Sequence, residues 1–119
     1  MPDKKCVLIC DDDNSILDVC KIILHEEYRV ATVTSCENII ENIKAINPQI
    51  VLMDVLMPGE GARAAKTIHQ TLETSHIPVI LFSALSNIKE ISKSAKATAL
   101  LEKPFDLKVL LETVRKYIL

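Results

Sequence analysis

Glycine is nearly absent from this chain, because only Gly59 and Gly61 occur among its 119 residues. Phosphate-binding loops of the dinucleotide and P-loop types need several glycines, where the backbone turns sharply or approaches the phosphate closely. Tryptophan is missing altogether, and aromatic residues make up only 3% of the chain. The scarcity of glycine argues against dinucleotide-binding and P-loop nucleotide-binding sites.

Long apolar runs and blocks of basic residues are also missing. The first apolar run, at residues 6–10, is too short for a signal peptide, and no later run approaches the length of a membrane span. The 14 basic and 16 acidic residues give a net charge of −2, with no Lys/Arg block, so direct nucleic-acid binding has little support. We expect a cytoplasmic protein that binds neither a membrane nor nucleic acid directly.

The cysteines do not form a recognisable metal or disulfide pattern. There is no C-x-x-C pair, and no histidine is spaced as a zinc partner. Buried free thiols in a reducing compartment are expected at all four positions, Cys6, Cys10, Cys20 and Cys36.

What the chain does have is a regular alternation of two hydrophobic patterns, in a length that suits one domain. Short runs rich in β-forming residues predict strands at 6–10, 28–33, 49–53, 77–82 and 99–101. Apolar residues at helical spacing follow each run, at 16–24, 39–46, 61–72, 88–95 and 107–118. Caps are expected at Asp13 or Asn14, at Ser86 and at Asp106. Five strands alternating with five helices predict an α/β fold, with a parallel sheet covered by helices on both faces.

Polar residues follow the predicted strands at the points where the strands end. Asp11 and Asp12 follow the first strand, Asp54 the third, Ser83 the fourth and Lys103 the fifth. Carboxyl ends of parallel strands share one edge of the sheet, which is where open α/β sheets bind their ligands. Three carboxylates are suitable ligands for Mg²⁺, which prefers oxygen. A lysine and a hydroxyl opposite the metal would complete a binding site for a phosphoryl group, because both can bond its charged oxygens. Taken alone, the acidic turn could equally be a solvated helix cap.

Four segments in this order carry a resemblance to a known family. They are Val7–Asp13 (VLICDDD), Pro48–Gly59 (PQIVLMDVLMPG), Pro78–Ala84 (PVILFSA) and Lys103–Phe105 (KPF). From about residue 4 to the C-terminus, the chain resembles the receiver domain of bacterial two-component response regulators. The resemblance implies a single receiver domain over 1–119. Its fold would be a three-layer (βα)5 flavodoxin-like one, with a parallel sheet in the order 2-1-3-4-5.

The resemblance also implies a role for each acid. Asp54 would be the phosphoacceptor, taking a phosphoryl group from a sensor histidine kinase or a phosphotransfer protein. Asp12 and Asp54 would hold Mg²⁺ together with the main-chain carbonyl of Leu56. Asp11 would act mostly through a metal-bound water.

The remaining site residues and the output are implied in the same way. The Ser83 hydroxyl would bond a phosphoryl oxygen, and Lys103 would pair with the carboxylate and later with the phosphoryl group. Phosphorylation would change the surface made by the fourth helix, the fifth strand and the fifth helix. A downstream protein or a fused output domain would recognise that surface, and the chain would be a monomer or a weak dimer through it.

Three features depart from the family pattern. Leu100 stands where the family usually has an aromatic residue, so the switch would work through the fourth helix and loop movement or be weakly coupled. The segment Met57–Gly61 is one residue shorter than the usual M-P-x-x-D-G. Leu56 and Leu85 are apolar where the family controls access of water, which predicts slow self-dephosphorylation.

Two other functions remain open from the sequence. A Mg²⁺-dependent hydrolase of the haloacid-dehalogenase type needs a second acid two residues after the nucleophile, and this chain has Leu56 there. The complete set of acids, hydroxyl and lysine argues against a receiver that acts as a constitutive adaptor, whereas Leu100 and the shortened segment after Asp54 leave that function open. We therefore expect a signalling phosphoacceptor and not an enzyme.

Overall fold

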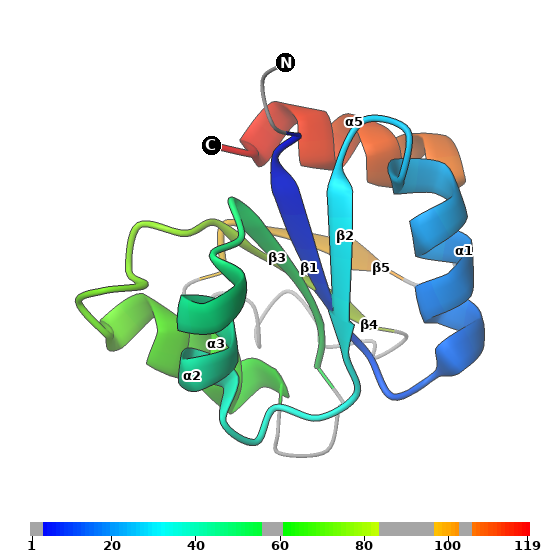
Figure 1. Ribbon diagram of the computed structural model, residues 1–119. Coiled ribbons are helices and arrows are strands. Elements are labelled where there is room, and N and C mark those ends of the chain that lie inside the picture. Colours follow the sequence, from blue (N-terminus) through cyan, green and yellow to red (C-terminus); the bar gives the residue numbers. More distant parts are fainter. Residues whose placement is uncertain (1–3, 56–60, 84–96, 103–105) are drawn as a thin grey trace.

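Five parallel strands form one sheet at the centre of the computed structural model, which describes residues 4–55, 61–83, 97–102 and 106–119 (Figure 1). The strands are β1 (Cys6–Cys10), β2 (Arg29–Val33), β3 (Ile50–Asp54), β4 (Val79–Ser83) and β5 (Ala99–Glu102). Their order in the sheet is β2-β1-β3-β4-β5. This is the flavodoxin-like order that the resemblance implies, so the predicted fold class is confirmed.

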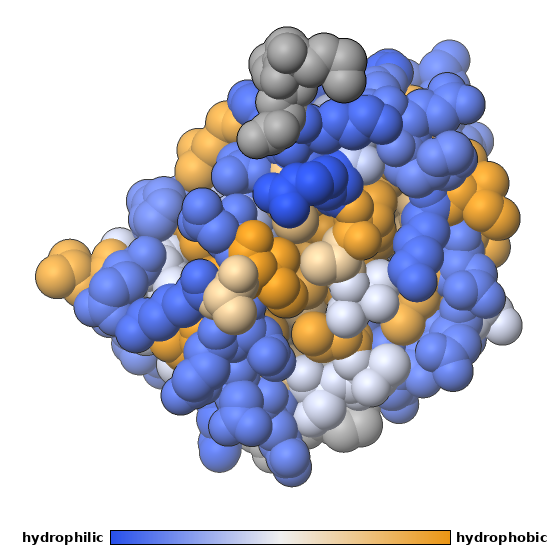
Figure 2. All heavy atoms as spheres, in the orientation of Figure 1, coloured by the Kyte–Doolittle hydropathy of each residue, from blue (hydrophilic) through white to orange (hydrophobic). Residues whose placement is uncertain are grey.

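The central strands are apolar along their whole length because helices cover them on both sides. Every residue of β1 and β3 is buried, as expected for strands in the interior of a parallel sheet. The edge strand β2 is half-buried after an exposed Arg29. Figure 2 shows the consequence, since apolar and neutral side chains remain visible around this edge while polar residues cover the helices beside it.

Four helices lie in the described part of the chain, two on each face of the sheet (Figure 1). Helices α1 (Asn14–Leu24) and α5 (Leu107–Tyr117) pack on one face through Leu17, Leu24 and Leu110. Helices α2 (Ile39–Ile46) and α3 (Gly61–Gln70) pack on the other through Ile43 and Ile68. The helix predicted after Ser86 lies outside the described residues, so the helix labels pass from α3 to α5.

The caps predicted at Asp13 and Asp106 are present at the starts of α1 and α5. Asp13 accepts a hydrogen bond from the Ser15 amide at 2.9 Å and so caps α1. Asp106 caps α5 by accepting from the Lys108 amide at 2.7 Å. Helix α2 ends at Asn47, whose φ of 56° lies in the left-handed region that stops helices.

The predicted third helix extends too far in the sequence. The structure ends α3 at Gln70, and the Leu72 side chain, expected on the buried stripe, is 84% exposed. The cause is Thr74, a buried residue whose hydroxyl donates to the carbonyl oxygen of Ile68 at 2.7 Å. This bond satisfies a carbonyl at the helix end and turns the chain before a further helical turn can form.

No helix in the described part of the chain is both long enough and apolar enough to cross a lipid bilayer.

Candidate functional site

Three carboxylates meet at the carboxyl edge of the sheet. One oxygen from each of Asp11, Asp12 and Asp54 lies within 4.8 Å of the other two. Asp11 is fully buried, Asp54 is 7% exposed, and Asp12 is exposed. Such a concentration of like charge, partly removed from water, is unfavourable until a cation or another positive group compensates it.

The turn after β1 sets the position of the first two acids. The Asp11 amide donates to the Val33 carbonyl oxygen at 3.2 Å, which continues the β1–β2 pairing by one residue. An Asp11 carboxylate oxygen then accepts from the Asp13 amide at 2.9 Å. Because Asp13 also caps α1, the turn between β1 and α1 is held at both ends, and Asp12 projects from it beside Asp11.

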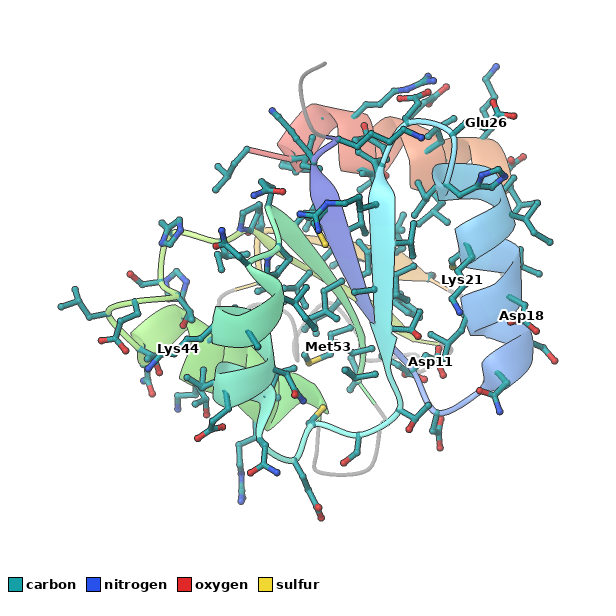
Figure 3. All side chains as sticks on the ribbon, in the orientation of Figure 1. Asp11, Asp18, Lys21, Glu26, Lys44 and Met53 are labelled. Atoms are coloured by element: carbon teal, nitrogen blue, oxygen red, sulfur yellow. The ribbon has the colours of Figure 1, made fainter. Side chains whose placement is uncertain are left out.

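Strand pairing brings Asp54 to the same place. Cys10 is the register partner of Met53, so the residues that follow each of them, Asp11 and Asp54, lie side by side at the sheet edge. On the other side Asp54 pairs with Phe82, and the Val55 amide donates to the Phe82 carbonyl oxygen at 3.2 Å. Figure 3 shows Asp11 and Met53 near the lower ends of β1 and β3. Residues more than 40 positions apart are thus adjacent because parallel strands end together.

The spacing of the oxygens fits a small divalent cation. Mg²⁺ binds oxygen at 2.0–2.1 Å with octahedral geometry, so oxygens on opposite sides of the ion are about 4.2 Å apart. Oxygens within 4.8 Å of one another can therefore share one ion, some directly and some through a bound water. The site is an acidic cluster that could hold Mg²⁺.

Of the other predicted site residues, the structure describes the backbone of Ser83 but not Lys103 or Leu56. Ser83 ends β4, and its register partner Glu102 ends β5, so the backbone places Ser83 at the same edge as the acids. Lys103 and Leu56 lie outside the described residues. Leu100 is a half-buried residue of β5 paired with Leu81.

A group of sulfur atoms lies next to the acids. All four cysteines are buried free thiols, as the sequence predicts. The Cys36 Sγ lies 3.9 Å from the Met53 Sδ. Burial, with a smaller contribution from the Asp54 charge, raises the pKa of Cys36 to about 11. Burial also raises the pKa of Cys10 well above its usual value, assisted by Cys36 and Asp11. These thiols stay protonated at neutral pH and pack as small apolar groups.

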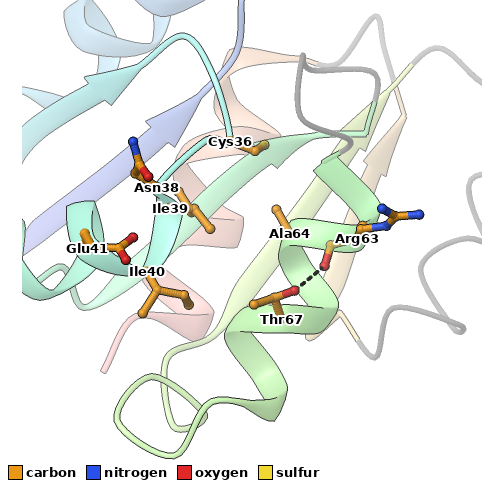
Figure 4. Close-up of a pocket in the computed structure, with 8 residues that line it drawn as sticks. All are labelled: Cys36, Asn38, Ile39, Ile40, Glu41, Arg63, Ala64 and Thr67. Carbon is orange, nitrogen blue, oxygen red and sulfur yellow. Dashed lines mark hydrogen bonds between the residues drawn. The ribbon is translucent and has the colours of Figure 1, made fainter.

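A shallow cleft of about 290 Å³ separates the first turns of α2 and α3 (Figure 4). Its walls come from Ile39 and Ile40 on one side and Ala64 and Thr67 on the other, with Cys36 among the lining residues. None of the acids in the cluster lines it. Sequence patterns did not indicate this cleft, because it depends on how two helices sit against each other.

The chain belongs to the response regulator receiver domain family, whose model matches residues 7–115. Domains of this family are signalling phosphoacceptors and not classical enzymes. The family resemblance inferred from the four sequence segments is therefore confirmed.

Individual relatives agree with this assignment. The chain is 31% identical to the chemotaxis protein CheY of Halobacterium salinarum, covering 85% of this chain and 86% of that one. It is 29% identical to the transcriptional regulatory protein CseB of Streptomyces coelicolor, covering 97% of this chain and 50% of CseB. A CheY-like receiver domain protein from Methanospirillum hungatei superimposes with a TM-score of 0.85 at 27% identity, covering 95% and 92% of the two chains.

The chain spans half or less of the length of several curated relatives that it matches. In those proteins the matched segment is one part of a longer chain.

Proposed function

We propose that this chain is a phosphorylation-controlled signalling switch, organised as one receiver domain over residues 1–119, with Asp54 as phosphoacceptor. The observation that carries the proposal is the meeting of Asp11, Asp12 and Asp54 within 4.8 Å at the sheet edge of a receiver-family chain. The phosphoryl donor is a phosphohistidine of a sensor histidine kinase or a phosphotransfer protein.

The reaction is an in-line displacement at phosphorus. An Asp54 carboxylate oxygen forms the new P–O bond while the P–N bond to the histidine breaks, and the donor imidazole leaves. Asp12, Asp54 and the main-chain carbonyl of Leu56 would hold the Mg²⁺ ion, and Asp11 would act mostly through a water bound to it. The ion supplies the positive charge that lets an anionic carboxylate approach an anionic phosphoryl group.

Ser83 and Lys103 complete the site in this proposal. Lys103 balances the charge of the phosphorylated aspartate, and the Ser83 hydroxyl donates to a phosphoryl oxygen. Their engagement changes the surface made by β5, α5 and the helix predicted after Ser86, which a downstream protein or a fused output domain recognises. With Leu100 in place of an aromatic residue, the change passes through the helix predicted after Ser86 and through loop movement, or is only weakly coupled to phosphorylation. Any dimer is weak and uses the same surface.

Treatment with acetyl phosphate and Mg²⁺, followed by intact mass spectrometry, tests the phosphoacceptor. We expect one added phosphoryl group on the wild type, none on Asp54→Asn, and none on the wild type after EDTA treatment. Asp18→Asn is the matched control, because Asp18 is an exposed acid on α1 outside the cluster (Figure 3). An unmodified wild type, or a fully modified Asp54→Asn, would rule out the proposal.

The same sample measures how long the modification lasts. Apolar residues at Leu56 and Leu85 predict a slowly hydrolysed acyl phosphate, because neither side chain can orient a water. After removal of acetyl phosphate, we expect the added mass to decay over minutes or longer. Decay within seconds would contradict this part of the proposal.

A further inference from the structure

The first residue of α3 lies directly against the backbone of Asp54. Gly61 is buried, and a Cβ atom built on it would overlap the carbonyl oxygen of Asp54. The same Cβ would lie 2.9 Å from the Asp54 carbonyl carbon and 3.1 Å from the Cα of Val55. All three contacts are with backbone atoms, which cannot rotate away as a flexible side chain would.

Conformation does not explain a glycine at this position. Gly61 lacks the positive φ that only glycine adopts easily. As the first residue of a helix, it would by helix propensity alone be replaced favourably by alanine. Space is therefore what requires the glycine, since no other residue lets α3 begin against the end of β3.

The backbone that Gly61 touches is the part of β3 that orients the acid cluster. The Asp54 peptide is held on its other side by the hydrogen bond from the Val55 amide to Phe82, at 3.2 Å. Pressure from a side chain at residue 61 cannot be absorbed locally, because that hydrogen bond and the sheet pairing resist it. The displacement would pass to the Asp54 side chain and change its distance from Asp11 and Asp12.

We propose that Gly61 is a positioning residue for phosphoryl transfer, which sets the place of Asp54 in the acid cluster through the close approach of α3 to the Asp54 carbonyl. The inference rests on the proposed function of Asp54. It adds a residue that itself touches neither metal nor phosphoryl group.

The test compares Gly61→Ala with wild type and with Ile68→Val. Ile68 lies two turns further along α3 on the same buried face, so Ile68→Val loosens the packing of this helix without adding atoms against Asp54. For each protein we would measure thermal stability, Mg²⁺ affinity by calorimetry, and the rate of phosphorylation by acetyl phosphate at saturating Mg²⁺. Measurements in trimethylamine N-oxide, which favours folded states, keep a destabilised variant folded.

We expect Gly61→Ala to slow phosphorylation by between about tenfold and 100-fold, the cost of misplacing a reacting group by up to about 1 Å. Its Mg²⁺ affinity should fall as well, while Ile68→Val keeps the wild-type rate and affinity. Wild-type values for folded Gly61→Ala would overturn the inference, and so would equal losses in Ile68→Val. A Gly61→Ala chain that stays unfolded in the osmolyte also counts against it, because Gly61 would then serve the fold and not the position of Asp54. Failure of the wild type to accept a phosphoryl group would instead remove the proposed function itself.

Discussion

At the scale of single residues, the acid cluster combines one exposed carboxylate with two that are buried. Asp12 faces water, while Asp11 and Asp54 are held under the sheet edge. The buried pair cannot move apart, because the β1–α1 turn fixes one and the β3–β4 pairing fixes the other. The repulsion among the three carboxylates opposes folding, and a bound divalent cation would reduce it.

Neutralising the exposed acid should therefore stabilise the protein when no divalent ion is present. We expect Asp12→Asn to raise the free energy of unfolding in EDTA by up to about 1 kcal/mol, the range for exposed charge pairs. In saturating Mg²⁺ the sign should reverse, because the variant has lost a ligand. Urea unfolding in both conditions checks this, with Asp18→Asn as the control that should show no reversal.

Because the pKa of Cys36 is raised in the folded state, we expect the protein to lose folding stability at alkaline pH. Folding raises this pKa from 9.0 to about 11, so the folded chain keeps a proton that the unfolded chain releases. The stability gained from this difference is complete below pH 9 and is lost as the pH rises towards about 11. We expect Cys36→Ala to lose less stability than wild type over that interval. Parallel slopes for the two proteins between pH 9 and 11 would contradict the assignment.

At the scale of elements, the sequence predicted the strands and the helix starts well. Continuous apolar runs identify β1 and β3 because helices cover both faces, and Asp13 and Asp106 mark helix starts because their carboxylates satisfy free amides. The predicted end of the third helix was wrong. Leu72 continues the apolar spacing, whereas the hydrogen bond from Thr74 to Ile68 ends the helix earlier. Apolar spacing does not contain that information.

The cap of α5 gives a prediction at this scale. Removing the carboxylate in Asp106→Ala leaves the Lys108 amide without its acceptor and should cost about 1 kcal/mol. Asp106→Asn keeps an oxygen acceptor and should cost much less. Thermal or urea unfolding of the two variants measures the difference, and equal losses would mean that the charge and not the hydrogen bond matters.

At the scale of the whole molecule, the sheet divides the core into two parts. One part lies under α2 and α3 and includes Ile68, and the other lies under α1 and α5 and includes Ile9. On the face covered by α1 and α5, Arg115 of α5 donates a hydrogen bond to the carboxylate of Glu27, which follows α1 in the chain. This ion pair lowers the pKa of Glu27. Among the described residues, the sheet separates the side chains of the two parts, which belong to different clusters.

Losses of packing on opposite faces should therefore add. Ile9→Val and Ile68→Val each remove one buried methyl group and should each cost about 1 kcal/mol. The double variant should lose the sum to within about 0.5 kcal/mol, as sites without shared partners do. A double-mutant cycle by urea unfolding checks this, and a larger coupling energy would show that the sheet transmits strain between its faces.

The sequence by itself determined the family, the order of the elements and the identity of the acids, because these depend on local patterns and on residue types at strand ends. Only the tertiary structure decided that Asp11, Asp12 and Asp54 share one space, since strand register and not sequence spacing sets their separation. It also pointed to the role of Gly61, which the sequence presents only as the last residue of a shortened segment and the first residue of a predicted helix. That role arises from the close packing of α3 on the end of β3, a contact between backbones that no side-chain pattern records.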